Sequence, residues 1–128
     1  MEHRAIKSFA TSIFALVATA AASDVAFVVT SDFSSGGFSS LTADRTLTSI
    51  DLPVYQDLGI TEAQGMIYIL EKFGQDNIIV VDPANPAQAV RQFSTGNGSN
   101  PQQMAVVSPT KAYITRLERA EILIVNPA

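Results

Sequence analysis

One pattern of apolar strands and polar hairpins recurs about every 43 residues, and it constrains the fold more than any other feature of the chain. Each copy has an apolar strand with an aromatic residue, a polar hairpin and a second apolar strand. The aromatic residues Phe27, Tyr68 and Tyr113 follow one another after 41 and 45 residues. The strand ends at Asp82 and Asn126, each followed by proline, are 44 residues apart. These two spacings agree, and they predict a repeat protein.

The intervals between the copies predict further short strands, separated by turns rich in Gly, Pro and Asn. We expect these strands near residues 46–52, 55–60, 90–94 and 104–107. No window after residue 22 shows a sustained 3.6-residue periodicity, so no helix is expected there. Four antiparallel strands per period are typical of β-propeller blades, which stack face to face because a single sheet cannot cover its own two faces.

The apolar segments 78–81 and 122–125 suit interior strands that are covered on both faces. The sequence therefore predicts an all-β fold, an incomplete β-propeller of four-stranded antiparallel blades, with repeats near residues 25–65, 66–111 and 112–128. Residues 23–128 supply about two and a half blades, whereas a closed ring has about 4 to 8. We therefore expect a fragment of a longer ring, or a protein that assembles from several copies.

These residues resemble the YVTN-type β-propeller repeat, a family similar in fold to surface-layer propellers and to the β-chain-like propellers of quinoprotein amine dehydrogenases. The resemblance is carried by residues 67–70, 75–77, 79–82, 98–101, 113–115 and 124–126. It covers about residues 25–128 and implies a scaffold without indicating a chemistry, because the motif residues are structural. The hairpin of the first copy departs from the family pattern, since residues 34–37 (Ser-Ser-Gly-Gly) replace the usual asparagine.

The first 22 residues have the pattern of a helical secretory signal peptide. Arg4 and Lys7 precede an apolar stretch over residues 9–22, and the small residues Ala20 and Ala22 before Ser23 predict cleavage after Ala22. The stretch is too short to span a membrane, which needs about 20 apolar residues. An amphipathic helix packed on the domain is the alternative. We expect a periplasmic, secreted or cell-surface protein without a stable membrane span.

Charge and composition exclude several kinds of site. The net charge is −4 for the whole chain of 128 residues and −5 after removal of residues 1–22, which disfavours binding to nucleic acid. The chain has no cysteine, and its one histidine, His3, lies in the signal segment. The mature chain therefore lacks the residues for a Ser-His-Asp or Cys-His site and the usual ligands of zinc. We expect no catalytic residue, no metal site and no cofactor.

Only weak candidates for binding remain. Lys72, Arg116 and Arg119 are predicted to lie in equivalent hairpins, where they would meet an anionic partner or simply be solvated. Asp76 and Asp82 are interpreted as a turn residue and a strand-end cap. Isolated loop carboxylates such as Asp32, Asp57 and Asp76 offer at most a weak site for a hard cation. Glu118 and Glu121 are expected at a solvated hairpin tip, and the glycine-rich segment 96–98 is expected to be a turn.

The sequence therefore predicts an exported, non-catalytic binding or structural scaffold, whose ligand or protein partner it does not identify. Two alternatives remain open. One is a fragment of a propeller enzyme or dehydrogenase subunit whose catalytic residues lie in other blades, an inference from fold analogy alone. The other is a cell-surface module that associates with itself through exposed blade edges.

Overall fold

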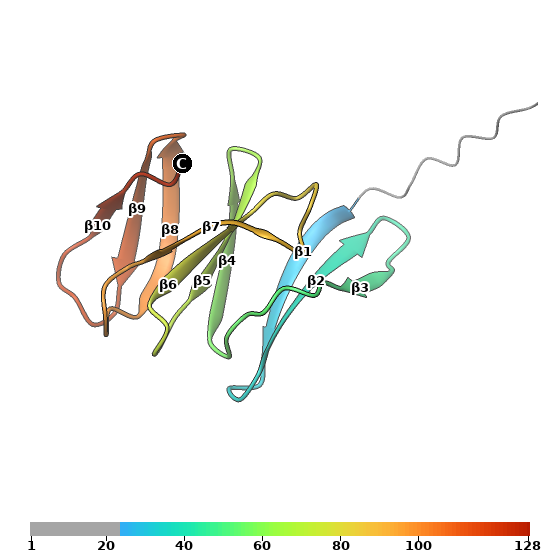
Figure 1. Ribbon diagram of the computed structural model, residues 1–128, viewed down its shortest axis with the longest axis horizontal. Helices are drawn as coiled ribbons and strands as arrows, with labels where there is room; N and C mark the ends of the chain where they lie inside the picture. Colours follow the sequence, from blue (N-terminus) through green and yellow to red (C-terminus); the bar gives the residue numbers. More distant parts are fainter. Residues whose placement is uncertain (1–23) are drawn as a thin grey trace, which may run out of the picture.

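The computed structural model describes residues 24–128, which form ten strands in three antiparallel sheets (Figure 1). The predicted signal peptide and its cleavage residues Ala20, Ala22 and Ser23 lie outside the described residues. Within the described part the chain forms no helix, so it contains no helix that could cross a membrane. The prediction of an all-β, antiparallel fold is confirmed.

Each sheet is a meander of strands that are consecutive in the sequence. The first sheet consists of β1 (Asp24–Ser31), β2 (Gly36–Thr42) and β3 (Leu47–Ser49). The middle sheet consists of β4 (Leu58–Ala63), β5 (Met66–Glu71), β6 (Asn77–Val81) and β7 (Ala89–Ser94). The last sheet consists of β8 (Pro101–Ser108), β9 (Lys111–Arg116) and β10 (Leu123–Val125).

The middle sheet is apolar on both faces, because β5 and β6 are nearly continuous runs of β-branched and aromatic residues. Ile69 pairs with Ile79 on the face toward the first sheet, and Leu70 pairs with Ile78 on the face toward the last sheet. All four side chains are at most 1% exposed. The expectation that residues 78–81 form an interior strand is therefore confirmed.

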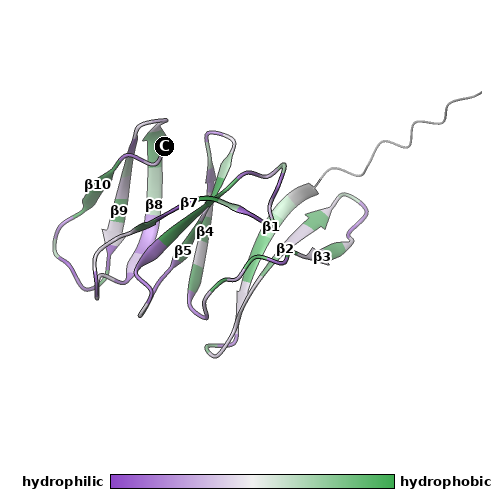
Figure 2. Ribbon diagram, viewed as in Figure 1, coloured by the Kyte–Doolittle hydropathy of each residue, from purple (hydrophilic) through white to green (hydrophobic). Residues whose placement is uncertain are grey.

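Two hydrophobic cores lie between the three stacked sheets, along the strands that Figure 2 colours as hydrophobic. The core between the first and middle sheets contains Phe38, Leu52, Ile67, Ile69, Ile79 and Val81. The core between the middle and last sheets contains Tyr68, Leu70, Ile78, Val80, Met104, Ala112 and Ile114. The sheets are therefore held together by side-chain packing across their faces, while backbone hydrogen bonds act within each sheet.

The expectation for residues 122–125 is wrong. Leu123 and Val125 pack on the core, but Ile122 is 59% and Ile124 is 60% exposed. The reason is that β10 belongs to the last sheet, and no other sheet covers the far face of that sheet within residues 24–128. A run of apolar residues cannot show by itself whether one face or both will be covered.

The strand predicted near residues 55–60 begins later, at Leu58. The backbone amide of Tyr55 donates a hydrogen bond of 2.9 Å to the Glu71 carboxylate, and the Asp57 carbonyl accepts one of 2.8 Å from the amide of Lys72. These bonds hold residues 55–57 as a connection against the end of β5, so pairing of β4 with β5 starts at Leu58 and Glu71.

The hairpins β1–β2, β5–β6 and β9–β10 turn at the same end of the sheets (Figure 1). The Ser31 hydroxyl at the end of β1 donates to the Gln56 carbonyl, just before β4, and Lys72 after β5 bonds Asp57 in the same connection. Strand β1 therefore runs in the same direction as β5 and β9 and is their equivalent in the first sheet. In the middle sheet β4 lies beside β5 on the side away from β6, but no described strand lies beside β1 on the side away from β2.

We predict that Ile79→Ala lowers the free energy of unfolding by about 2–5 kcal/mol, because Ile79 is 1% exposed and truncation leaves a cavity in the first core. Val90→Ala on β7 is the matched control, since Val90 is 63% exposed and its truncation should change stability by less than about 0.5 kcal/mol. Urea unfolding of both variants measures the difference. Equal losses would contradict the assignment of the core.

Candidate functional site

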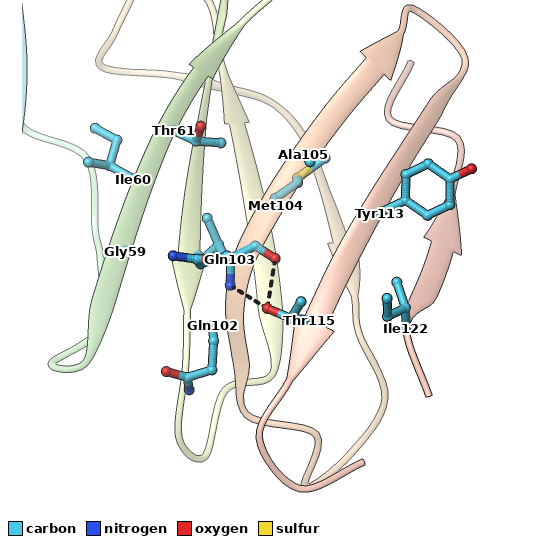
Figure 3. Close-up of a pocket in the computed structure, with 11 residues that line it drawn as sticks. Gly59, Ile60, Thr61, Gln102, Gln103, Met104, Ala105, Tyr113, Thr115 and Ile122 are labelled. Carbon is cyan, nitrogen blue, oxygen red and sulfur yellow. Dashed lines mark hydrogen bonds between the residues drawn. The ribbon is translucent and has the colours of Figure 1, made fainter. Parts of the chain in front are cut away.

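A cleft of about 430 Å³ runs beside β4 and β8, the edge strands of the middle and last sheets (Figure 3). It is lined by Gly59, Ile60, Thr61, Leu70, Gln102, Gln103, Met104, Ala105, Tyr113, Thr115 and Ile122. Gly59 faces β8, since a Cβ built there would lie in ordinary contact with the Gln102 carbonyl oxygen, at 3.8 Å, and 3.3 Å from the Lys72 Cε. The cleft therefore lies where the edges of two sheets meet.

The residues that line the cleft include no acid, no lysine, no arginine and no histidine. Their polar groups are amides and hydroxyls, set among the apolar side chains of Leu70, Met104 and Ile122. Gln102 is held in place, since its Nε2 donates to the Asn100 Oδ1 at 2.7 Å. This chemistry suits recognition of an uncharged polar molecule by hydrogen bonds.

The two strands beside the cleft also present backbone groups. Within residues 24–128, β4 pairs only with β5 and β8 pairs only with β9, so each strand has one edge without a neighbouring strand. At β8 the pairing is interrupted between Pro101 and Gln103, where the Gln103 amide donates a hydrogen bond of 3.2 Å to the Thr115 Oγ1. Such an edge can accept an extended segment through main-chain hydrogen bonds.

The hairpin end of the molecule contains a buried polar network centred on Asp76. Its carboxylate accepts hydrogen bonds from the amides of Gly98 (2.6 Å) and Asn100 (2.7 Å). Its carbonyl accepts bonds from the amide (2.7 Å) and the hydroxyl (2.9 Å) of Thr95. Asp76 is 6% and Thr95 is 2% exposed. Asp76 is thus a turn residue, as expected, and in addition it fixes the connection from β7 to β8.

Each of the three predicted cationic residues lies at this hairpin end and contacts the protein itself. The Lys72 ammonium lies 3.8 Å from the Asp57 carboxylate. The Arg116 guanidinium donates a bond of 3.1 Å to the Thr95 carbonyl and lies 3.9 Å from the Glu121 carboxylate. Arg119 donates to the carbonyl oxygens of Asn97 at 2.7 Å and Glu118 at 2.8 Å, within the same group of loops. These three side chains therefore link the hairpins to neighbouring loops of the same protein. Binding of an anionic partner by them stays a prediction.

The three loop carboxylates considered for a hard cation are each engaged separately. The amides of Ser34 and Ser35 donate to Asp32 and lower the pKa of its carboxyl to about 2. Asp57 pairs with Lys72, and Asp76 holds the loop described above. No three acidic or histidine side chains gather to hold a metal ion in the described part of the chain.

Sequence reasoning missed Glu71, which is 7% exposed at the end of β5. Its carboxylate accepts a bond of 2.8 Å from the Asn77 side-chain amide in addition to the bond from Tyr55. A charged residue directly after an apolar strand was the available signal. Asp82 forms the expected turn, with its carboxylate accepting a bond of 2.8 Å from the Ala84 amide. Glu118 and Glu121 are exposed, as predicted for a hairpin tip.

The chain matches no protein-family model, and no curated protein sequence is similar to it. The resemblance to the YVTN-type repeat therefore stays a prediction that depends on the residues given above.

We predict that Asp76→Ala lowers the free energy of unfolding by about 2–4 kcal/mol, because the substitution leaves the amides of Gly98 and the buried Asn100 without their acceptor. Asp76→Asn, which keeps one carbonyl acceptor and tolerates the positive φ of 54° at this position, should lose less. Asp82→Ala is the control and should lose about 1 kcal/mol or less. Denaturant unfolding of the three variants ranks their free energies of unfolding. A decrease for Asp82→Ala as large as for Asp76→Ala would contradict the role of Asp76.

Proposed function

We propose that residues 24–128 act as a non-catalytic binding scaffold of the β-propeller type. Three observations support the propeller arrangement: the antiparallel meander of each sheet, the face-to-face stacking, and the equivalent hairpins at one end. In such an arrangement the first strand of each blade lines the axis of the ring. Strands β4 and β8 have this place in the middle and last sheets, so the cleft beside them would face the axis.

The ligand that the cleft suits best is an uncharged, extended peptide segment. The observation that carries this proposal is the combination of a lining without carboxylate, lysine, arginine or histidine and two strand edges without a neighbour in the described residues. The strand edges would bind the peptide backbone, and the hydroxyl and amide groups of Thr61, Gln103 and Thr115 would bind its polar side chains.

The test is a titration of the full chain with an acetylated and amidated peptide of alternating Val and Thr residues, followed by the backbone amide NMR signals. We expect the signals of residues 59–61 and 102–105 to shift, and Gly59→Val to weaken binding at least about tenfold by filling the space between the strands. The control is Ser49→Val, which adds the same kind of bulk on β3, away from the cleft.

Two results would overturn the proposed function. The first is selective binding of a neutral oligosaccharide with no shift caused by the peptide, since this would remove the role of the strand edges. The second is turnover of a lactone, phosphoester or amine by the purified chain. The second result would favour the alternative of an enzyme fragment.

We propose further that the protein is exported and begins at Ser23 in its mature form, a proposal supported by the pattern of residues 1–22. N-terminal sequencing of the protein from an expressing bacterial cell should give Ser23 as the first residue. Ala22→Arg should block cleavage and leave the longer form, whereas Ala21→Gln, at the variable position of the motif, should be cleaved normally. An uncleaved wild-type chain in the cytoplasm would contradict the proposal.

A further inference from the structure

The two outer sheets each leave one face uncovered within the described residues. On each of these faces apolar side chains lie beside polar ones, such as Lys111 and Thr115 on the last sheet and Ser39 and Ser49 on the first. We call the face of a sheet that points in the direction of the next sheet along the chain its leading face, and the opposite face its trailing face. The leading face of the last sheet carries Ala105, Tyr113, Ile122 and Ile124. The trailing face of the first sheet carries Ala26, Val28, Leu41 and Leu47, of which Leu47 is 62% exposed.

These two faces are equivalent to faces that already pack on each other inside the molecule. Tyr68 on the leading face of the middle sheet is 4% exposed because the trailing face of the last sheet, with Met104, Ala112 and Ile114, covers it. Tyr113 occupies in β9 the place that Tyr68 occupies in β5, one sheet later. The first core repeats the arrangement, with Phe38 of the first sheet against the trailing face of the middle sheet.

The internal interfaces therefore specify what covers a leading face, namely the trailing face of another sheet of this kind. We propose that a second copy of this chain packs its first sheet on the last sheet of its neighbour, so that Tyr113 and Ile124 meet Val28 and Leu41 of that copy. The contact continues the stacking of apolar faces already present at the two internal interfaces.

The proposed interface is heterologous, because two different surfaces meet. The pair still has, within residues 24–128 of its two copies, one uncovered leading face and one uncovered trailing face, so further copies add until the rotation per copy closes a ring, or a fibre forms. This differs from pairing through strand edges, which would join β1 or β10 of two copies by backbone hydrogen bonds. The proposal goes beyond the proposed function, since it concerns the stacking of copies and is tested without peptide. The proposed interface shares Ala105, Tyr113 and Ile122 with the lining of the cleft, so peptide binding is measured separately on the monomer.

The absence of cysteine permits a direct test of which surfaces meet. Ile124→Cys and Val28→Cys are prepared separately in the full chain and treated with a short bis-maleimide cross-linker at about 0.5 mM protein. The mixture of the two variants should form a covalent dimer that contains one copy of each, whereas either variant alone should remain uncross-linked. Cross-linking of Ile124→Cys with itself would indicate a symmetric contact and would overturn the proposal.

Sedimentation velocity over a range of concentrations is the second measurement. The wild type should increase in size with concentration, and Ile124→Asp should weaken association at least about tenfold by placing a charge in the interface. The control is Leu117→Asp, which is likewise a change from an exposed aliphatic residue (66% exposed) to an acid but lies in the β9–β10 hairpin. This variant should associate as the wild type does. A wild type that stays monomeric at about 0.5 mM, with circular dichroism of a folded β protein, would overturn the proposal. Peptide titration below the concentration at which copies associate reports separately on the proposed function.

Discussion

A sheet that is apolar on both faces must be covered on both sides, and in this protein that requirement falls on β5 and β6. The side chains of Ile69 and Ile79 point toward the first sheet and those of Leu70 and Ile78 toward the last sheet. All four are almost fully buried. Within residues 24–128, neither the first sheet nor the last sheet has a core of its own, because each buries only the face that packs against the middle sheet. The stacked order of the three sheets follows from this single pair of strands.

Polar contacts then determine how the sheets are joined. Two buried carboxylates at the hairpin end, Glu71 and Asp76, accept the backbone amides of the connections that lead into β4 and β8. Each connection would otherwise leave buried amides without an acceptor. Because both connections are held, β4 and β8 are placed side by side, and the cleft between the two sheet edges results from this placement.

Much of the fold could be predicted from the sequence, since the spacing of Phe27, Tyr68 and Tyr113 reflects the local pattern of each hairpin. The burial of residues 78–81 was predictable for the same reason. The exposure of Ile124 was not, because it depends on which sheet lies opposite, and the start of β4 was not, because it depends on the bond from Tyr55 to Glu71. The cleft could not be predicted either, since Gly59 and Gln103 approach each other only when two separate sheets stack.

The Asp76 network has a consequence for the order in which the chain folds. Thr95, Gly98 and Asn100 are bonded to a hairpin that precedes them in the sequence, and the residues before β4 are bonded to Glu71, which follows closely. The four strands of the middle sheet can therefore pair before β8 leaves the ribosome. The carboxylate of Asp76 in the β5–β6 hairpin is then in place to accept the amides of Gly98 and Asn100. Synthesis from the N-terminus would add each new sheet to a finished surface, so that long stretches of unpaired strand are never exposed together.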